Sequence, residues 1–213
     1  MAAKLKSFWK NNFMHLLEIA KRRKTVRHFK SKEVSLEDML YCIEVAKEAP
    51  SGMNSQPWRF VIITDDDIKK NIRKICEKRE KEFHEKLKGK LKEWLKEKHI
   101  IWKKNFIEEA PILLLIFSSK EFPYFVQSTW LAIGYLLLAL EEKGLATVTY
   151  TPPNPEEVRK YIGAPDEYKL EAILPIGYSA DEKEKEERKN LEEITYLNEW
   201  KQYFKYKSHI LSG

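Results

Sequence analysis

A dense group of cationic side chains containing one hydroxyl lies near the beginning of the sequence. Residues 21 to 29 read Lys-Arg-Arg-Lys-Thr-Val-Arg-His-Phe and follow an amphipathic stretch. Guanidinium groups can hold two phosphate oxygens at once, and a threonine hydroxyl can bind one more. The pattern therefore indicates a phosphate site. A solvated helix end would carry the same residue types, so the motif alone leaves both interpretations open.

The second chemically suggestive segment is the proline loop, residues 49 to 58. It contains two prolines, one glycine and several short polar side chains, which favour turns. A helix and a strand can be joined by two or three residues, so this longer connection is typical of a loop that binds something. Such a loop can present backbone N–H groups and small hydroxyls, with Trp58 as a wall or anchor. An ordinary connection is the alternative.

Composition limits the architectures and the partners. The 213 residues, 43% of them hydrophobic, suffice for one domain or a tightly merged pair with a sizeable core. The net charge is +6, but the 39 basic residues are interleaved with 33 acidic ones. This mixture is typical of an ion-paired surface and argues against a nucleic-acid partner. The small positive excess still suits anionic small ligands.

The sequence carries no pattern for a membrane, a disulfide framework or a metal. Residues 1 to 10 are polar and basic, unlike a signal peptide. The longest apolar run, 130 to 140, is shorter than the roughly 20 residues that a membrane span needs. Cys42 and Cys76 lie far apart, and the five histidines lack metal-ligand spacing. We expect a cytoplasmic protein without a bound metal.

Hydrophobic periodicity predicts the elements that must position these segments. Helical patterns cover residues 4–21, 35–46 and 125–143, and a short helix is expected after Asn154. Strand patterns cover residues 59–63, 112–117, 145–150 and 170–176. Between the first two strands, residues 66 to 109 are charge-dense and weakly apolar, with a break expected at Gly89. We call this region the lid, although an arm or a dimer contact would have the same composition.

Five motifs in order resemble the FMN-dependent nitroreductase superfamily. Arg-Lys-Thr-Val-Arg at 23–27 and Ala-Pro-Ser-Gly at 49–52 with Gln-Pro-Trp at 56–58 are similar to its first two motifs. Glu-Ala-Pro at 109–111, Gly-Leu-Ala-Thr-Val-Thr at 144–149 with Thr-Pro at 151–152, and Leu-Pro-Ile-Gly-Tyr at 174–178 resemble the iodotyrosine deiodinase branch. The Arg-Lys pair at 188–189 fits the same branch. The resemblance covers residues 16 to 195.

The resemblance implies an FMN site and assigns roles to single residues. Arg23, Lys24 and Thr25 match the phosphate-binding positions, and Arg27 matches a nearby flavin contact. The loop along the flavin is matched by Pro50, Ser51 and Gly52. At the other edge of the flavin stand Thr149, Tyr150 and Thr151, of which the Thr151 hydroxyl has the catalytic position near N5. Arg188 matches a phosphate-binding arginine that, in the family, comes from the neighbouring subunit.

On the substrate side the resemblance implies a lid that holds an amino acid zwitterion. Glu80 matches the group for the ammonium and Lys104 the group for the carboxylate. The backbone N–H of Met53 matches the contact to the substrate phenolate. The sequence departs from the branch at the lid tyrosine, whose position falls on His84 or its neighbour Phe83. Substrate identity and affinity are the properties that this departure puts in question.

The expectation is thus an α+β fold with a mostly antiparallel sheet flanked by helices, forming a single domain over residues 1 to 213. The resemblance implies a homodimer, and residues 190 to 213 are expected to extend onto the partner. The expected activity is FMN-dependent reductive dehalogenation of halotyrosines. A broad NAD(P)H-dependent nitroreductase or quinone reductase is the alternative. A flavin-binding protein without redox activity is the third possibility. NAD(P)H or another reductant would recharge the flavin.

Overall fold

The computed structural model describes residues 16 to 202, and the chain divides into two compact units, one ending at Lys183 and one beginning at Glu184. The helix predicted over residues 4 to 21 is represented by α2 (Leu16–Arg22), and the rest of it lies outside the described residues. The part of the predicted C-terminal extension beyond residue 202 lies outside them as well.

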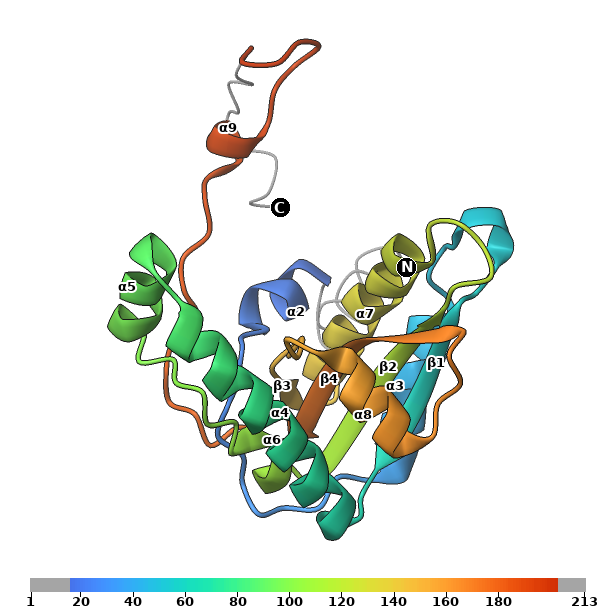
Figure 1. Cartoon of the computed structure of the whole chain (residues 1–213). Helices are drawn as coiled ribbons and strands as arrows, with labels where there is room; N and C mark the ends of the chain where they lie inside the picture. Colours follow the sequence, from blue (N-terminus) through green and yellow to red (C-terminus); the bar gives the residue numbers. More distant parts are fainter. Residues whose placement is uncertain (1–15, 203–213) are drawn as a thin grey trace, which may run out of the picture. The chain divides into compact units, whose positions relative to one another are not determined.

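The first unit contains an antiparallel sheet with the strand order β1-β2-β4-β3 (Figure 1). The strands are β1 (Trp58–Ile63), β2 (Ile112–Ser119), β3 (Ala146–Thr147) and β4 (Tyr168–Gly177). Each coincides with a predicted strand, although β3 is shorter than the predicted 145–150. The long pairing of β2 with both neighbours places this strand, whose residues 112 to 118 are all buried, in the middle of the sheet.

Helices cover both faces of this sheet, as the alternation of side chains along β2 requires (Figure 1). Leu114 and its alternate neighbours in β2 pack with α3 (Leu36–Lys47) and α7 (Phe125–Glu142). Leu113 and Leu115 pack on the opposite face with α4 (Asp66–Lys86), α6 (Phe106–Glu109) and α8 (Pro155–Ile162). The fold is therefore α+β with the sheet between helices, as predicted.

Local sequence signals explain where the helices begin and end. The Ser35 side chain accepts a hydrogen bond from the Glu37 N–H at 3.1 Å, and Asn154 caps α8 with Pro155 at its first turn. The lid is interrupted as expected: α4 ends at Lys86 and α5 (Gly89–Glu97) begins at Gly89. Gly89 has a φ of 65°, a backbone conformation that side chains other than glycine rarely adopt.

A buried carboxylate lies at an irregularity in β4. Ile116 of β2 pairs with Ala172 and the next residue pairs with Leu170, which leaves Glu171 as the extra residue of a β-bulge. Glu171 accepts hydrogen bonds from Ser118 Oγ at 2.7 Å and Trp130 Nε1 at 3.2 Å. Lys169 Nζ lies 3.0 Å from the same carboxylate. The bulge residue is thus fully paired, and we interpret the cluster as structural.

The second unit contains the short helix α9 (Leu191–Ile194), which begins with a capping box between Asn190 and Glu193. The rings of Tyr196 and Trp200 lie 4.7 Å apart between their centroids. Arg188 belongs to this unit. Within residues 16 to 202, none of the helices combines the length and the apolar character that crossing a membrane demands.

The centre of β2 should be the part of the fold most sensitive to loss of volume. Leu114 is fully buried, so Leu114→Ala should lower the free energy of unfolding by about 2–5 kcal/mol through lost burial and a cavity. Leu91 in α5 is 47% exposed, and Leu91→Ala should change it by about 0.5 kcal/mol or less. Urea unfolding of the FMN-saturated variants measures both, and similar losses would contradict this placement of the core.

Candidate active site

The cationic segment, residues 23 to 27, lies along the edge strand β3. Thr25 forms a parallel bridge with Thr147, and the Val26 N–H donates to the Thr147 carbonyl at 3.0 Å. Val26 is fully buried, whereas Thr25 and Arg27 are exposed. Side chains alternate along an extended backbone, so burial of Val26 directs its two neighbours outward. The sheet edge thus presents a hydroxyl and a guanidinium side by side.

The two cations before Thr25 differ in their surroundings. Arg23 follows α2 directly and is partly exposed, with its N–H bonded to the Ile19 carbonyl at 3.0 Å. Lys24 Nζ donates to the backbone carbonyls of Asp181 at 2.8 Å and Lys183 at 2.6 Å. The Lys24 ammonium therefore anchors the end of the first unit against the cationic segment. Its role in phosphate binding stays a prediction.

The threonine segment, residues 149 to 151, leaves β3 on the same edge. Tyr150 is fixed to β4 by two hydrogen bonds with Ile173, its N–H to the carbonyl at 3.1 Å and the reverse bond at 2.8 Å. Thr149 is half-buried and Thr151 is exposed. Because Thr25 is bridged to Thr147, the fold brings the cationic segment and the threonine segment to one edge of the sheet.

The predicted lid residues Glu80 and Lys104 meet in a buried ion pair. Lys104 Nζ lies 3.2 Å from Glu80 Oε2, and each residue is only 6% exposed. His84, one turn further along α4, places Nε2 3.5 Å from the same oxygen. The hydroxyl of Tyr150 donates to the other oxygen, Glu80 Oε1, at 2.9 Å. We call these four residues the lid cluster.

The lid cluster connects elements that are far apart in the sequence. Glu80 and His84 come from α4, Lys104 from the segment before α6, and Tyr150 from the threonine segment. Glu77, also on α4, fixes the Lys104 backbone by accepting its N–H at 2.8 Å, and Arg73 pairs with Glu77 at 2.8 Å. Lys104 is therefore held from both its backbone and its side chain.

Burial keeps the Tyr150 hydroxyl protonated. The side chain is 8% exposed, and desolvation, followed by the neighbouring Cys76 and Glu80, raises the pKa of Tyr150 well above its usual range. Burial likewise raises the pKa of the Cys76 thiol to about 12. Tyr150 therefore remains a hydrogen-bond donor to Glu80 at any ordinary pH.

The structure bears on the choice between His84 and Phe83 for the position of the lid tyrosine. His84 lies four residues after Glu80, so both side chains lie on one face of α4, and His84 contacts the Glu80 carboxylate. Phe83 is 41% exposed and contacts the His84 ring edge-on at 6.0 Å. His84 is thus the one of the two that belongs to the lid cluster.

The proline loop, with Pro50, Ser51, Gly52 and Met53, lies at a different place in the same chain. Its Gly52 N–H donates to Ser128 Oγ in the first turn of α7 at 3.1 Å. Arg22, next to the cationic segment, pairs with Glu141 near the other end of α7 at 3.2 Å. At 1.5 Å per residue, Ser128 and Glu141 are about 20 Å apart along the helix. One chain therefore keeps the proline loop and the cationic segment at opposite ends of α7 (Figure 1).

The backbone of the proline loop has an unusual conformation. Met53, Asn54 and Gln56 have φ angles of 54°, 52° and 42°, in the left-handed region that side chains other than glycine seldom occupy. Ser51 Oγ stabilises the turn by accepting the Gln56 N–H at 3.0 Å. Met53 is 66% exposed. The loop therefore has a fixed shape that turns Met53 outward, which is typical of a binding segment.

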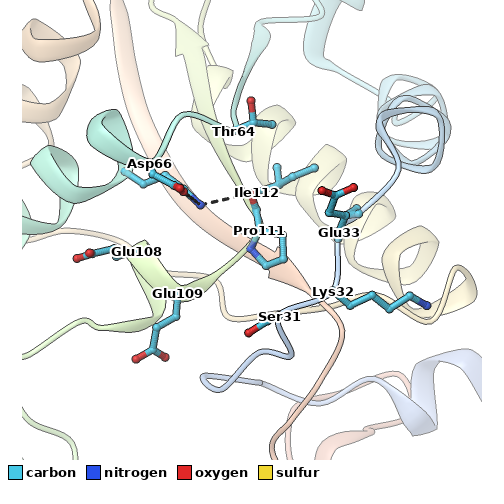
Figure 2. Close-up of a pocket in the computed structure, with 11 residues that line it drawn as sticks. Ser31, Lys32, Glu33, Thr64, Asp66, Glu108, Glu109, Pro111 and Ile112 are labelled. Atoms are coloured by element: carbon cyan, nitrogen blue, oxygen red, sulfur yellow. Dashed lines mark hydrogen bonds and ion pairs between the residues drawn. The ribbon is translucent and has the colours of Figure 1, made fainter.

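A pocket of about 460 Å³ lies beside the first turn of α4 and contains none of the predicted site residues (Figure 2). Its walls come from residues 31–34, 64–69 and 108–112. Lys69 is buried there, with Nζ 2.8 Å from Asp66 Oδ1 and 2.9 Å from the Ala110 carbonyl. The buried charge of Lys69 is thus paired within the wall of the pocket.

The family model that describes the nitroreductase family matches residues 20–178. The chain belongs to the nitroreductase family. This membership confirms the resemblance drawn from the motifs, and the α+β fold agrees with it. Tyr150 beneath the lid and Glu77 beside Lys104 were not expected in these roles. The only sequence signal for Glu77 was its position on the same helical face as Glu80.

Relatives within the nitroreductase family are similar over most of the chain. An iodotyrosine deiodinase of Thermotoga neapolitana is 57% identical over 170 residues, covering 80% of this chain and 91% of the relative. Human iodotyrosine deiodinase 1 is 37% identical over 179 residues, covering 78% and 61%. A crystal structure of oxidized iodotyrosine deiodinase bound to FMN and 3-iodo-L-tyrosine is similar with a TM-score of 0.81 and 56% identity, covering 83% and 96%.

Proposed function

We propose that this protein is an FMN-dependent oxidoreductase that dehalogenates halogenated tyrosine reductively. The net reaction breaks the aryl carbon–halogen bond, consumes two electrons and one proton, and yields tyrosine and halide. FMN, when bound, supplies the electrons. The observation that carries the proposal is the buried Glu80–Lys104 pair, joined through Tyr150 to the threonine segment. It provides one negative and one positive group for the amino acid end of the substrate.

The residues at the sheet edge fit the chemistry of FMN. Arg23, Thr25 and Arg27 offer guanidinium and hydroxyl donors for a phosphate and for an electron-rich flavin edge. The exposed Thr151 offers a hydroxyl close along the chain to the buried Tyr150. The crystal structure with 56% identity contains FMN, which supports the same cofactor here. We assign Thr151 as the hydroxyl that hydrogen-bonds near N5.

The lid cluster fits an amino acid zwitterion. In this proposal the substrate ammonium binds Glu80 and the substrate carboxylate binds Lys104, so each ligand charge replaces one half of the internal ion pair. His84 lies 3.5 Å from the carboxylate oxygen of Glu80 that Lys104 approaches, and we assign His84 to the position of the lid tyrosine. The exposed Met53 N–H would meet the phenolate. Closing the lid would exclude water and strengthen both pairings.

We further propose a homodimer with two shared cofactor sites. The cationic segment and the proline loop are held at opposite ends of α7, so one chain is poorly arranged to surround a single flavin with both. A two-fold symmetric dimer can bring the loop of one chain to the cationic segment of its partner, and it then forms the site twice. Arg188 is assigned to the phosphate of the partner's cofactor, as the resemblance implies.

The reductant and the location are also proposals. We expect NAD(P)H or a comparable reductant to recharge the flavin, a step for which this fold needs no separate nicotinamide motif. We place the protein in the cytoplasm. Cys42 and Cys76 are both unpaired and buried, which is typical of proteins from reducing compartments.

The proposed function predicts stoichiometric deiodination. The FMN-loaded protein, reduced anaerobically with dithionite, should convert 3-iodo-L-tyrosine to tyrosine and release one iodide per reduced flavin. Flavin absorbance measures the oxidation of the cofactor, and ion chromatography measures the iodide released. Fast reduction of a nitroaromatic without iodide release would favour the general nitroreductase. A reduced flavin that neither substrate reoxidises would favour a flavin-binding protein without redox activity.

A further inference from the structure

Tyr150 belongs to the threonine segment, which the resemblance assigns to the flavin, yet its side chain contacts the lid. The hydroxyl donates to Glu80 Oε1 at 2.9 Å, and Lys104 Nζ lies 5.9 Å from the centroid of the ring. The ring also packs edge-on against Phe106 at 5.7 Å. Phe106 begins α6, two residues after Lys104. One aromatic side chain therefore contacts three residues of the lid.

The backbone of Tyr150 cannot follow these lid residues if they move. Its N–H and carbonyl are both bonded to Ile173 in the middle of β4, at 3.1 and 2.8 Å. The hydroxyl is consequently a fixed donor, and burial keeps it protonated. A hydrogen bond from such a donor orients a carboxylate more firmly than a bond from a flexible surface side chain.

The two oxygens of Glu80 have different partners. Tyr150 binds Oε1, whereas Lys104 and His84 both approach Oε2, at 3.2 and 3.5 Å. A substrate ammonium that replaces Lys104 at Oε2 would leave the bond between Tyr150 and Oε1 in place. Tyr150 thus holds Glu80 from the sheet edge, through the oxygen that Lys104 and His84 do not approach.

We propose that Tyr150 is a positioning residue for substrate specificity: it holds Glu80 Oε1 so that Oε2 faces the ammonium of the halotyrosine. This inference rests on the proposed function, because it concerns the same substrate. It links recognition of the amino acid end to the segment that carries Thr151. The affinity for substrates that lack an ammonium should not depend on Tyr150.

The test compares Tyr150→Phe with wild type by measuring dissociation constants of 3-iodo-L-tyrosine and 2-iodophenol through quenching of flavin fluorescence. The variant removes only the hydroxyl, and a hydrogen bond to a charged group is worth a change of roughly tenfold or more. We expect iodotyrosine to bind about tenfold more weakly and iodophenol to bind unchanged, with FMN content unaltered. Tyr161→Phe is the matched control, because Tyr161 accepts its hydrogen bond from Asn71 on the surface.

A double-mutant cycle shows whether Tyr150 affects substrate binding through Glu80. If Tyr150 acts through Glu80, Tyr150→Phe should have little further effect in the Glu80→Gln background. Equal effects in both backgrounds, or unchanged iodotyrosine affinity in Tyr150→Phe, would overturn the inference. Glu80→Asp, which keeps Tyr150 intact, should also lose affinity because the shorter carboxylate cannot reach both partners, and full affinity in that variant would overturn it too.

Failure of the inference and failure of the proposed function give different results. If wild type binds iodotyrosine and iodophenol equally, the proposed substrate is wrong. If wild type prefers iodotyrosine and Tyr150→Phe retains the whole preference, the substrate stands and the role of Tyr150 is wrong.

Discussion

Lys104→Ala is expected to weaken the binding of 3-iodo-L-tyrosine by about 100-fold while the FMN content stays at the wild-type level. The variant removes the cation assigned to the substrate carboxylate, so this carboxylate would be buried without an opposite charge. Glu80, which lies 3.2 Å from Lys104 in the wild type, stays available for the ammonium. Losing one partner of a desolvated charge pair costs about 2–5 kcal/mol of binding free energy, and 2.7 kcal/mol corresponds to 100-fold. Glu80→Gln should have a similar effect through the ammonium.

Neighbouring residues provide matched controls for these two variants. Lys103 is exposed, with its ammonium over the ring of Trp102, and Glu85 is exposed on α4. Lys103→Ala and Glu85→Gln make the same chemical changes outside the lid cluster and should leave iodotyrosine affinity within about twofold of wild type, as surface charges contribute little. Isothermal titration of the four variants with iodotyrosine and iodophenol separates the zwitterion from the ring. If the wild type binds iodotyrosine no more tightly than iodophenol, the lid cluster does not bind the amino acid end of the substrate.

Arg23→Ala combined with Thr25→Ala is expected to weaken FMN binding by about 100-fold or more, with almost no change for riboflavin. The two side chains are assigned to the cofactor phosphate, and each charge-assisted hydrogen bond contributes about 1.5–3 kcal/mol. Riboflavin lacks the phosphate, so its affinity should not change when these two side chains are removed. Equilibrium dialysis of the apoprotein with each flavin measures the difference.

Lys21 offers the control, since it is an exposed cation of α2 that pairs with Glu18 at 3.2 Å. Lys21→Ala should retain full FMN affinity. Equal affinity of the wild type for FMN and riboflavin would contradict the assignment of the cationic segment.

The proposed shared site predicts how much FMN is bound by dimers formed from two different variants. Chains with Arg23→Ala and Thr25→Ala and chains with Gly52→Val should each lose FMN. The first lack the donors assigned to the phosphate, and the second carry a branched side chain in the loop segment assigned to the flavin. If every site takes the cationic segment and the proline loop from different chains, refolding equal amounts together should restore about a quarter of the FMN, because half of the dimers are mixed and each has one intact site. No restoration would show that both segments serve the site from one chain.

The sequence by itself determined the elements and much of the site chemistry. The continuity and length of the apolar runs indicated β1, β2 and β4, because burial on both faces requires continuous apolar side chains. The break at Gly89 followed from a backbone conformation that few other residues tolerate, and the cap at Asn154 followed from its side chain, which accepts the Glu156 N–H. The order of the motifs indicated the family, and the family implied the residues for FMN and for the zwitterion.

Only the tertiary structure decided how those residues meet. Strand pairing sets Thr25 beside Thr147, and no local pattern encodes a contact over such a separation. The direction of the Tyr150 side chain depends on its bridge to β4, so the sequence alone could not distinguish a flavin contact from a partner of Glu80. Likewise, the contact of His84, rather than Phe83, with Glu80 follows from how α4 packs on the sheet. Gly52 contacts one end of α7 and Arg22 contacts the other end. The length of α7 therefore separates the proline loop from the cationic segment, which the motifs had placed in one site. These facts arise from contacts between distant residues, whose geometry is set by sheet register and helix packing rather than by the residues near them in the chain.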